Sequence, residues 1–291
     1  MNVIEYSPAT NLGNWLFQIA FARCLTDEEV AIYIKDEYNK KKFLTYRELY
    51  PNVKVIDSLP SGLKEYTSTQ LEVDCFNLPT QRDGLLLKGC FQYERLFDRT
   101  ELKKMFRPPD WVFKHIHEKY GAVFNQTITV GISVRRGDYL NLPHRHPFVG
   151  RQFLKSAVEL FDVATTFIVC SDDLKWCKKY FSQNCFNKNK FIFIENEPVL
   201  VQLYIHTFCN HNIVSNSTFS WWGACLNRHS HRRVIMPSMW YGIAMRGRAS
   251  YLYFEDAEVI TNHYSLLMLL KAYYLCLRTR LGKLLRHLLE K

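Results

Sequence analysis

The sequence predicts an α/β protein whose C-terminal half is a doubly wound parallel sheet. Short runs rich in Val and Ile alternate there with stretches whose apolar residues recur at helical spacing, and this alternation is typical of βαβ units. The chain of 291 residues is long enough for two domains of ordinary size. The expected strands are 128–134, 166–170, 191–194, 212–215 and 233–236, and the expected helices are 149–162, 173–182, 198–209 and 218–228.

The N-terminal half is less regular but begins in the same way. A strand at 3–6 leads through a loop into a helix from about Asn14. Pro108 and Pro109 break a further helix at 98–106, and they mark the start of an interdomain segment. The other expected strands are 30–34, 53–56 and 85–87, and the expected division of the chain is 1–125, 126–260 and a C-terminal helix within 261–291.

Composition and cysteine usage narrow the class of protein. With 47% hydrophobic and 23% charged residues, the chain should bury a full core. The nine cysteines form no Cys-x-x-Cys pair and no zinc-binding spacing, which indicates free thiols in a reducing compartment. The N-terminus lacks the basic start and apolar run of a signal peptide, so a cytoplasmic protein is expected. No zinc-finger, RNA-recognition or helix-turn-helix signature is present, so nucleic acid is not an expected partner.

Two adjacent arginines follow the strand at 128–134 directly, in the segment Arg135-Arg136-Gly137-Asp138-Tyr139. Ligands of α/β sheets bind at the carboxyl ends of the strands. A guanidinium is planar and permanently charged, and it suits phosphate oxygens. The alternative is a surface turn whose arginines only pair with Asp138.

Two more polar segments follow strands of the same predicted sheet. Asp172 and Asp173 come after the strand at 166–170, and the segment Ser215 to Gly223 opens a helix after the strand at 212–215. Hydroxyls of Ser217 and Thr218 and the first helical N–H groups would suit a phosphate, although ordinary N-caps look the same. An aspartate here either reads the ring N–H groups of a purine or forms a plain N-cap.

Together these segments describe a nucleotide diphosphate held by arginine and helix-start donors. No Asp-x-Asp pair follows a strand, as a magnesium-bridged diphosphate would favour, so no metal is expected. His144 and His146 lie beside Pro143 and Pro147, where loop or substrate contacts are favoured over metal ligation.

These segments, together with Leu12 to Ala20 and Leu87 to Gln92, resemble bacterial α-1,2-fucosyltransferases of glycosyltransferase family 11. The resemblance runs from about residue 3 to residue 240 in the family's order. Its most specific part is Ser-Asn-Ser-Thr-Phe-Ser-Trp-Trp-Gly, from Ser215 to Gly223. It implies a GT-B-like fold of two Rossmann-like halves, GDP-β-L-fucose as donor, no cofactor or metal, and inversion at the anomeric carbon of fucose.

The chain departs from the family's pattern at two places. Ser133 stands two residues before the first arginine, where the family usually has histidine, and this difference bears on donor handling. The segment Thr10 to Gln18 replaces the usual Gly-Gly-Leu-Gly-Asn-Gln-Met-Phe-Gln, which is expected to reshape the acceptor side.

The resemblance also assigns roles to single residues. Arg135 is assigned to the β-phosphate, with Arg136 supporting it or pairing with Asp138. Asp138 is either the general base or the partner that holds an arginine in place, and His144 and His146 are the other candidates for the base. Trp15 either stacks on the acceptor or belongs to the core. The expected donor contacts are Gly13, Arg135, Arg136, Asp172, Asp173, Asn216, Ser217, Thr218 and Phe219, and the expected acceptor contacts are Asn14, Trp15, Gln18, His144 and His146.

The activity that the resemblance implies is transfer of L-fucose from GDP-fucose to a glycan hydroxyl, most often the 2-OH of a terminal galactose. The acceptor would be an oligosaccharide or a lipid-linked glycan of bacterial surface polysaccharide or O-antigen. Two alternatives stay open: a transferase of another GDP-sugar, and a non-catalytic module that binds nucleotides or glycans.

The tail from residue 265 to residue 291 is an expected basic amphipathic helix. Six of its residues are Lys or Arg and one is Glu, and leucines recur at spacings of three and four. We expect it to lie on an anionic membrane, which would make the protein peripheral on the inner membrane. Packing on the protein's own domains is the second interpretation and oligomerisation the third. The apolar stripe consists of Leu267, Leu270, Tyr274, Leu277, Leu281, Leu284 and Leu288.

Overall fold

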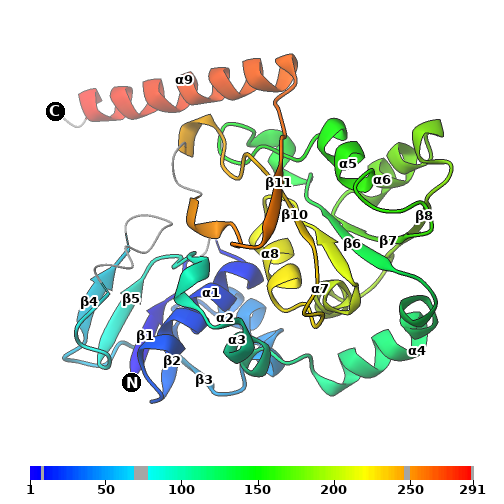
Figure 1. Cartoon of the computed structure of the whole chain (residues 1–291). Helices are drawn as coiled ribbons and strands as arrows, with labels where there is room; N and C mark the ends of the chain where they lie inside the picture. The colour runs from blue at the N-terminus through cyan, green and yellow to red at the C-terminus, as the bar shows by residue number, and fades with distance from the viewer. Residues whose placement is uncertain (8–9, 69–77, 246–249, 290–291) are drawn as a thin grey trace. The chain divides into compact units, whose positions relative to one another are not determined.

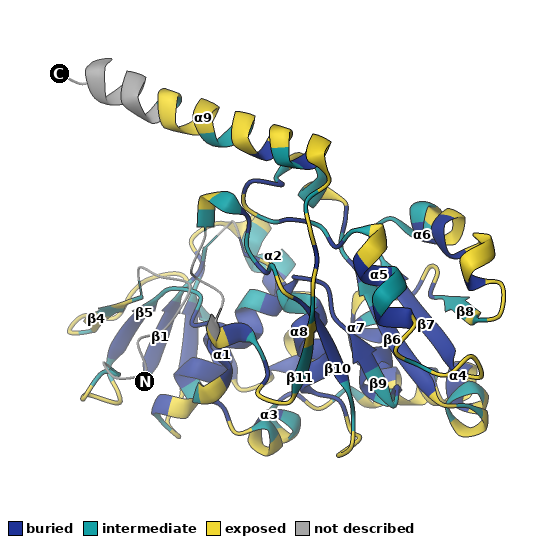
Figure 2. Cartoon of the chain, turned by 45° about the horizontal axis from the view of Figure 1, so that its top comes forward, coloured by how far each residue is buried: buried dark blue, intermediate teal, exposed yellow. Residues whose placement is uncertain are grey.

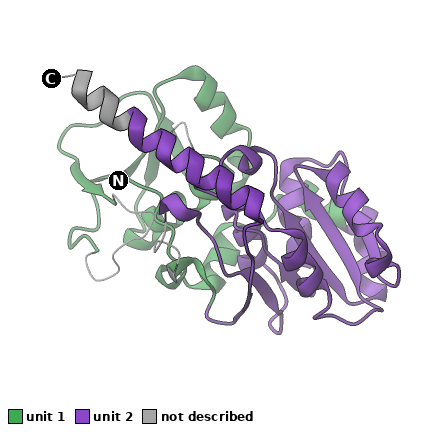
Figure 3. Ribbon diagram, turned by 90° about the horizontal axis from the view of Figure 1, so that it is seen from above, with its two compact units in different colours: residues 1–116, 250–254 green, residues 117–249, 255–291 purple. Residues whose placement is uncertain are grey.

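The computed structural model describes residues 1–7, 10–68, 78–245 and 250–289, with side chains in the last helix as far as residue 282 (Figure 1). The chain forms two compact units (Figure 3). Unit 1 consists of Met1–Ile116 and Ser250–Phe254, and unit 2 of His117–Ala249 and Glu255–Lys291. The sequence pattern had not indicated that a short segment near residue 250 belongs with the N-terminal part.

Unit 1 is built on a parallel sheet with the strand order β3-β2-β1-β5-β4. The strands predicted at 3–6, 30–34, 53–56 and 85–87 are confirmed, and a short exposed edge strand joins them. The five strands are β1 (Asn2–Glu5), β2 (Val30–Tyr33), β3 (Val53–Ile56), β4 (Lys64–Thr67) and β5 (Leu85–Lys88).

Three helices belong to unit 1: α1 (Leu12–Leu25), α2 (Glu37–Leu44) and α3 (Arg99–Met105). Helix α1 is the central one, and nearly all of its residues are buried. Its apolar side chains lie on every face, as in helices that are enclosed on all sides. Asp98 caps α3 by accepting hydrogen bonds from the backbone N–H groups of Thr100 and Glu101.

Unit 2 holds a six-stranded sheet with the order β11-β10-β9-β6-β7-β8. Every neighbouring pair of these strands is parallel. The five strands predicted for this half are confirmed, and one further edge strand follows them. The six are β6 (Thr129–Val134), β7 (Thr166–Ser171), β8 (Lys190–Phe193), β9 (His211–Ile213), β10 (Val234–Pro237) and β11 (Ala257–Ile260).

Helices cover both faces of this sheet. On one face, Val130 and Ile132 of β6 share a buried core with Phe153 of α5 (Arg151–Val158) and Cys177 of α6 (Leu174–Phe181). On the other face lie α7 (Val199–Phe208) and α8 (Thr218–Cys225). Gly131 of β6 faces α7 so closely that a Cβ there would be 2.5 Å from Nδ1 of His206. The predicted α/β class with two Rossmann-like halves is thus confirmed.

Two more helices complete the chain. Helix α4 (Asp110–Gln126) begins directly after Pro109 and carries the chain from unit 1 into unit 2. Helix α9 (Leu266–Leu289) is the helix predicted for the tail, and much of its described surface is exposed (Figure 2). Within the described residues, no helix combines the length and apolarity needed to cross a bilayer.

Candidate functional site

The order of strands in unit 2 changes direction between β6 and β9. From β6 the chain adds β7 and β8 on one side and then returns to add β9, β10 and β11 on the other. Such a switch point, at the carboxyl ends of the strands, is where open α/β sheets bind ligands. The arginine segment follows β6, the aspartate segment β7 and the segment from Ser215 β9. The prediction that these three segments meet at one edge is therefore confirmed.

Arg136 is packed into the protein at this edge. Its guanidinium carbon lies 3.8 Å from the ring centroid of Trp176 and 5.0 Å from that of Phe148. Its Nε donates to Asp173 at 3.1 Å. The side chain is only 11% exposed. Of the two roles predicted for Arg136, pairing with Asp138 is wrong: Arg136 pairs with Asp173, and Asp138 pairs with Arg135.

Arg135 is the accessible arginine of the pair. Its side chain is 36% exposed and lies between two carboxylates. Nη2 donates to Asp138 at 2.7 Å, and Nη1 forms an ion pair with Asp172 at 3.0 Å. The ring of Tyr139 lies under the guanidinium at 5.5 Å. An arginine held by two carboxylates keeps its charge and has a defined direction.

Gly137 allows the carboxylate of Asp172 to approach this segment. A Cβ at residue 137 would stand 2.6 Å from Oδ2 of Asp172, the oxygen that pairs with Arg135. The other oxygen of Asp172 accepts the backbone N–H of Arg136 at 2.8 Å. A residue with a Cβ at this position would displace the carboxylate, so the glycine permits the contacts that Asp172 makes with this segment.

The two aspartates already have protein donors. Asp172 binds Arg135 and the N–H of Arg136. Asp173 caps α6 by accepting the N–H of Trp176 at 3.2 Å and also binds Arg136. The N-cap interpretation therefore holds for Asp173. Each carboxylate has two oxygens and can accept further hydrogen bonds, so direct contact of Asp172 or Asp173 with the donor stays a prediction.

The start of α8 lies next to the arginine segment. The hydroxyl of Tyr139 donates to the backbone oxygen of Asn216 at 3.1 Å and so joins the two segments. The Asn216 side chain is buried, and its Nδ2 donates to the carbonyls of Pro147 and Trp240. Asn216 therefore fixes the loops around the site instead of presenting its amide to a ligand, contrary to its expected donor contact.

Ser217 occupies the N-cap position of α8 but makes no side-chain cap. The first N–H groups of a helix have no intrahelical partner, and they carry the positive end of its dipole. Thr218 and Phe219 begin the helix and are half-buried. The N-terminus of α8 is thus available to an anion at the same edge as Arg135.

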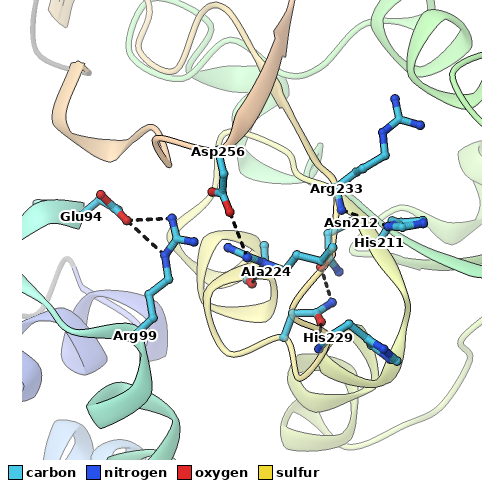
Figure 4. A network of polar contacts seen from close by, with 10 residues as sticks. Glu94, Arg99, His211, Asn212, Ala224, His229, Arg233 and Asp256 are labelled. Atoms are coloured by element: carbon cyan, nitrogen blue, oxygen red, sulfur yellow. Dashed lines mark hydrogen bonds and ion pairs between the residues drawn. The ribbon is translucent and has the colours of Figure 1, made fainter.

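A polar network holds the other end of α8 (Figure 4). Nε of Arg232 donates to the carbonyl of Ala224 at 3.2 Å, and its Nη1 pairs with Asp256 at 3.1 Å. Nδ2 of Asn227 donates to Oδ1 of Asn212, a residue of β9, at 2.7 Å. A cation at the C-terminus of a helix interacts favourably with the negative end of the helix dipole. These contacts fix the helix whose N-terminus faces the site.

The two histidines of the following loop differ in access. His144 is buried, and its Nδ1 has no hydrogen-bond partner among the described residues. His146 is half-buried and stacks on Tyr139, with ring centroids 4.8 Å apart. Burial lowers the pKa of His146 below its ordinary value, while the carboxylate of Asp138 acts in the opposite direction. His146 is therefore the more accessible of the two histidines, and the burial of His144 does not suit its expected contact with an acceptor.

In unit 1 the predicted acceptor residues lie where α1 meets the turn after β5. Oδ1 of Asn14 accepts from Nε2 of Gln92 at 2.8 Å, and Nε2 of Gln18 donates to the carbonyl of Gly89 at 2.7 Å. Gly89 has a positive φ of 153°. Since β1 and β5 are neighbours, this edge is the switch point of the first sheet.

Trp15 belongs to the core of unit 1. Its side chain is fully buried, and Nε1 donates to the hydroxyl of Thr10 at 3.0 Å. The indole ring packs near Phe43, with ring centroids 5.2 Å apart. The expected stacking on an acceptor sugar does not fit this burial. Gly13, expected to contact the donor, and Gln18 are buried on the same helix.

Two residues that shape the site are given no role by the sequence analysis. Trp176 stacks on Arg136, and Tyr139 links Arg135 to α8. The position of Trp176 three residues after Asp173, on the first turn of a predicted helix, was the signal that could have identified it. Among the described residues, no three His, Cys, Asp or Glu side chains are grouped as metal ligands.

Residues 64–245 match the sequence model of glycosyl transferase family 11. The chain is 30% identical over 136 residues to the O-antigen biosynthesis glycosyltransferase WbnK of Escherichia coli, over 44% of this chain and 43% of that protein. It is 29% identical over 161 residues to an α-1,2-colitosyltransferase of Escherichia coli, over 53% of this chain and 55% of that protein.

A likeness to galactoside α-(1,2)-fucosyltransferase 1 of Bos taurus covers 107 residues at 35% identity, 33% of this chain and 29% of that protein. Among solved structures, the fucosyltransferase NodZ from Bradyrhizobium matches with a TM-score of 0.49 at 15% identity, over 76% of this chain and 92% of that chain. The chain spans about half the length of the two Escherichia coli proteins. Because the family match extends over more than half of its residues, the chain belongs to glycosyltransferase family 11.

Proposed function

We propose that the protein transfers L-fucose from GDP-β-L-fucose to a hydroxyl of a glycan, with inversion and without a metal ion. Family membership supports a glycosyl transfer. The observation that carries the proposal is the position of Arg135, which stands accessible at the switch point beside the N-terminus of α8. A nucleotide diphosphate leaving group needs positive charge at that point.

Arg135 is the group assigned to the β-phosphate. A guanidinium has five N–H donors. Within the described residues, the polar contacts of Arg135 direct one donor to Asp138 and one to Asp172. The remaining donors suffice for a two-point contact with phosphate oxygens. The start of α8 adds N–H groups and a positive dipole end, so the departing GDP would be stabilised from two elements.

The acceptor must approach from the face opposite the leaving group. In the proposed displacement, the acceptor oxygen forms a bond to the anomeric carbon while the bond from that carbon to the β-phosphate oxygen breaks. The acceptor proton passes to Asp138, whose second oxygen is not used in its contact with Arg135. General-base help of this kind contributes roughly 10²–10⁴-fold. His146, on the ring of Tyr139, is the alternative base.

We propose the 2-OH of a terminal galactose as the acceptor, in an oligosaccharide or a lipid-linked O-antigen glycan. The names of three relatives support this choice: two of the names state α-1,2 transfer, and the third states a role in O-antigen biosynthesis. The likeness to a colitosyltransferase favours a second candidate function, in which the protein transfers a related deoxy sugar from its nucleotide-sugar donor.

A donor panel tests the proposal. The protein is incubated with GDP-fucose, GDP-colitose, GDP-mannose and UDP-galactose, with and without EDTA, and release of the nucleotide is followed. Release of GDP from GDP-fucose that EDTA leaves unchanged is the expected result. If the nucleotide were released from one of the other donors only, the transferred sugar would be the sugar of that donor. If a donor bound without release of its nucleotide, the protein would be a non-catalytic binding module. For the base, an acidic limb of the pH–rate profile that persists in Asp138→Asn would transfer the role to His146.

A further inference from the structure

Helix α9 has two apolar faces, and only one of them is covered. Met268 and Ala272 are buried, and α9 packs there against the short helix η5 (Ile243–Met245). At 100° per residue, these two side chains point away from Leu270 and Leu277, which are 59% and 58% exposed. The exposed face consists of Leu266, Leu267, Leu270, Tyr273, Tyr274, Leu277 and Leu281.

The described part of the predicted stripe is not packed on unit 2, the unit to which α9 belongs. The stripe includes Leu267, Tyr274 and Leu281, which are 79%, 62% and 58% exposed. Unit 2 therefore leaves this part of the stripe uncovered. An exposed apolar face of this length marks an interaction surface.

The charged side chains that helix α9 itself carries are all positive. From residue 261 to residue 289 the sequence contains no Asp or Glu, but it contains five Lys or Arg residues. On a helical projection, Lys271 and Arg278 border one side of the apolar face and Arg280 borders the other. A second copy of the helix would bring like charges together along both borders, which is unfavourable. An anionic lipid surface complements both the apolar face and its borders.

The N-terminal end of α9 is attached by hydrogen bonds to the loop that follows the arginine segment. Nζ of Lys271 donates to the carbonyl of Leu140 at 2.7 Å, and the hydroxyl of Tyr264 donates to the carbonyl of Pro143 at 2.5 Å. Leu140 lies two residues after Asp138, in the turn η3 (Asp138–Asn141). The exposed face is thus carried on an element that is attached to the candidate site.

We propose that α9 lies in the interface of an anionic membrane, with its exposed apolar face among the acyl chains and the bordering Arg278 and Arg280 at the headgroups. Five charged residues within 24 positions suit a helix that lies on a bilayer rather than across it. The attachment to Leu140 and Pro143 holds the loop from Asp138 to His146 near that surface. The proposal concerns where the protein binds, so it stands or fails independently of the transferred sugar.

The test measures sedimentation of the full-length protein with vesicles of phosphatidylcholine, with and without about one third phosphatidylglycerol. We expect binding to the anionic vesicles only, reduced by high salt because salt screens the charge attraction. The double variant Leu270→Asn/Leu277→Asn should lower the partition coefficient more than tenfold through lost apolar burial. Arg278→Gln and Arg280→Gln should each lower it roughly fivefold.

The matched control is Ile128→Asn/Val163→Asn, which replaces two apolar residues of unit 2 that are 53% and 58% exposed outside α9. It should bind vesicles like the unchanged protein, and circular dichroism should show that both double variants are folded. Equal binding to neutral vesicles, or an unaltered partition coefficient in the leucine variant, would overturn the proposal. So would a leucine-dependent dimer in sedimentation velocity without vesicle binding, which would assign the face to a second copy.

Discussion

The guanidinium of Arg136 lies over the indole ring of Trp176, at 3.8 Å from its centroid, while Arg135 one residue earlier remains 36% exposed. Adjacent residues at the end of a strand point in opposite directions, so one arginine enters the protein and the other faces the edge of the sheet. The two identical side chains therefore serve different purposes, and the same substitution should separate them.

Arg135→Lys should lower kcat/KM for GDP-fucose by roughly 10²–10³-fold, because an ammonium cannot reproduce the two-point contact with phosphate. Its free energy of unfolding should change little, because the side chain is partly exposed. Arg136→Lys should instead lower the free energy of unfolding by about 1–3 kcal/mol through the lost stacking and hydrogen bond. Donor turnover and urea denaturation of both variants measure the contrast. The opposite pattern would reverse the two roles.

Gly137→Ala should disturb the ion pair between Arg135 and Asp172. The added Cβ would meet Oδ2 of Asp172 at 2.6 Å, and the carboxylate must move away. We expect donor affinity, measured by calorimetry with GDP, to fall about tenfold or more, as a misplaced charge-assisted contact would cause. Gly282→Ala is the matched control, because a Cβ there meets no atom within 4 Å. Equal GDP affinities in the two variants would show that the close approach has no role in binding.

Trp15→Ala should destabilise unit 1 by about 3–5 kcal/mol, as expected for deletion of a fully buried aromatic side chain. It also leaves the buried hydroxyl of Thr10 without its donor. Chemical denaturation followed by fluorescence measures the loss. A variant of unchanged stability but raised KM for the acceptor would restore the stacking role that the sequence had suggested.

His206 should make the protein sensitive to mild acid. Complete burial lowers the pKa of His206 to about 4, and its Nε2 has no hydrogen-bond partner among the described residues. Between pH 4 and 6.5 the unfolded chain therefore binds a proton that the folded chain excludes, so stability is full above pH 6.5 and falls as the pH drops toward 4. The loss is on the order of 3 kcal/mol.

The thermal midpoint of the protein should accordingly fall between pH 7 and pH 5. In His206→Gln, which does not titrate, this part of the pH dependence should vanish even though the variant starts from a lower midpoint. An equal pH dependence in both proteins would mean that other groups cause the acid sensitivity.

The fold was predictable where strands are buried on both faces. Strand β7 reads Thr-Phe-Ile-Val-Cys-Ser and is almost entirely buried, so an apolar run marked it. The edge strands β4 (Lys-Glu-Tyr-Thr) and β11 (Ala-Glu-Val-Ile) were not predicted because charged residues interrupt their short sequences, and neither strand has a buried residue. Their sequences therefore carry no apolar run and little alternation.

The position of the site in the fold was predictable from the sequence, but the ion pairs between its arginines and aspartates were not. Polar residues after β6, β7 and β9 identified the edge of the sheet. Which carboxylate meets which arginine depends on the register of β6 against β7, in which Val134 lies opposite Ser171. That register brings Asp172 to Arg135 and Asp173 to Arg136. Spacing along the chain does not contain this information.

The segment from Ser250 to Phe254 has a consequence for how the protein is made. Leu252 and Phe254 are buried, Tyr251 packs on Tyr93 at 4.7 Å between ring centroids, and Arg99 lies over Phe254 at 4.9 Å. These contacts belong to unit 1, yet they are supplied only after most of unit 2, His117–Ala249, has been translated. The N-terminal part of unit 1 therefore leaves the ribosome first but receives these contacts late. Until then, the apolar surface that Ser250–Phe254 covers stays exposed on the nascent chain.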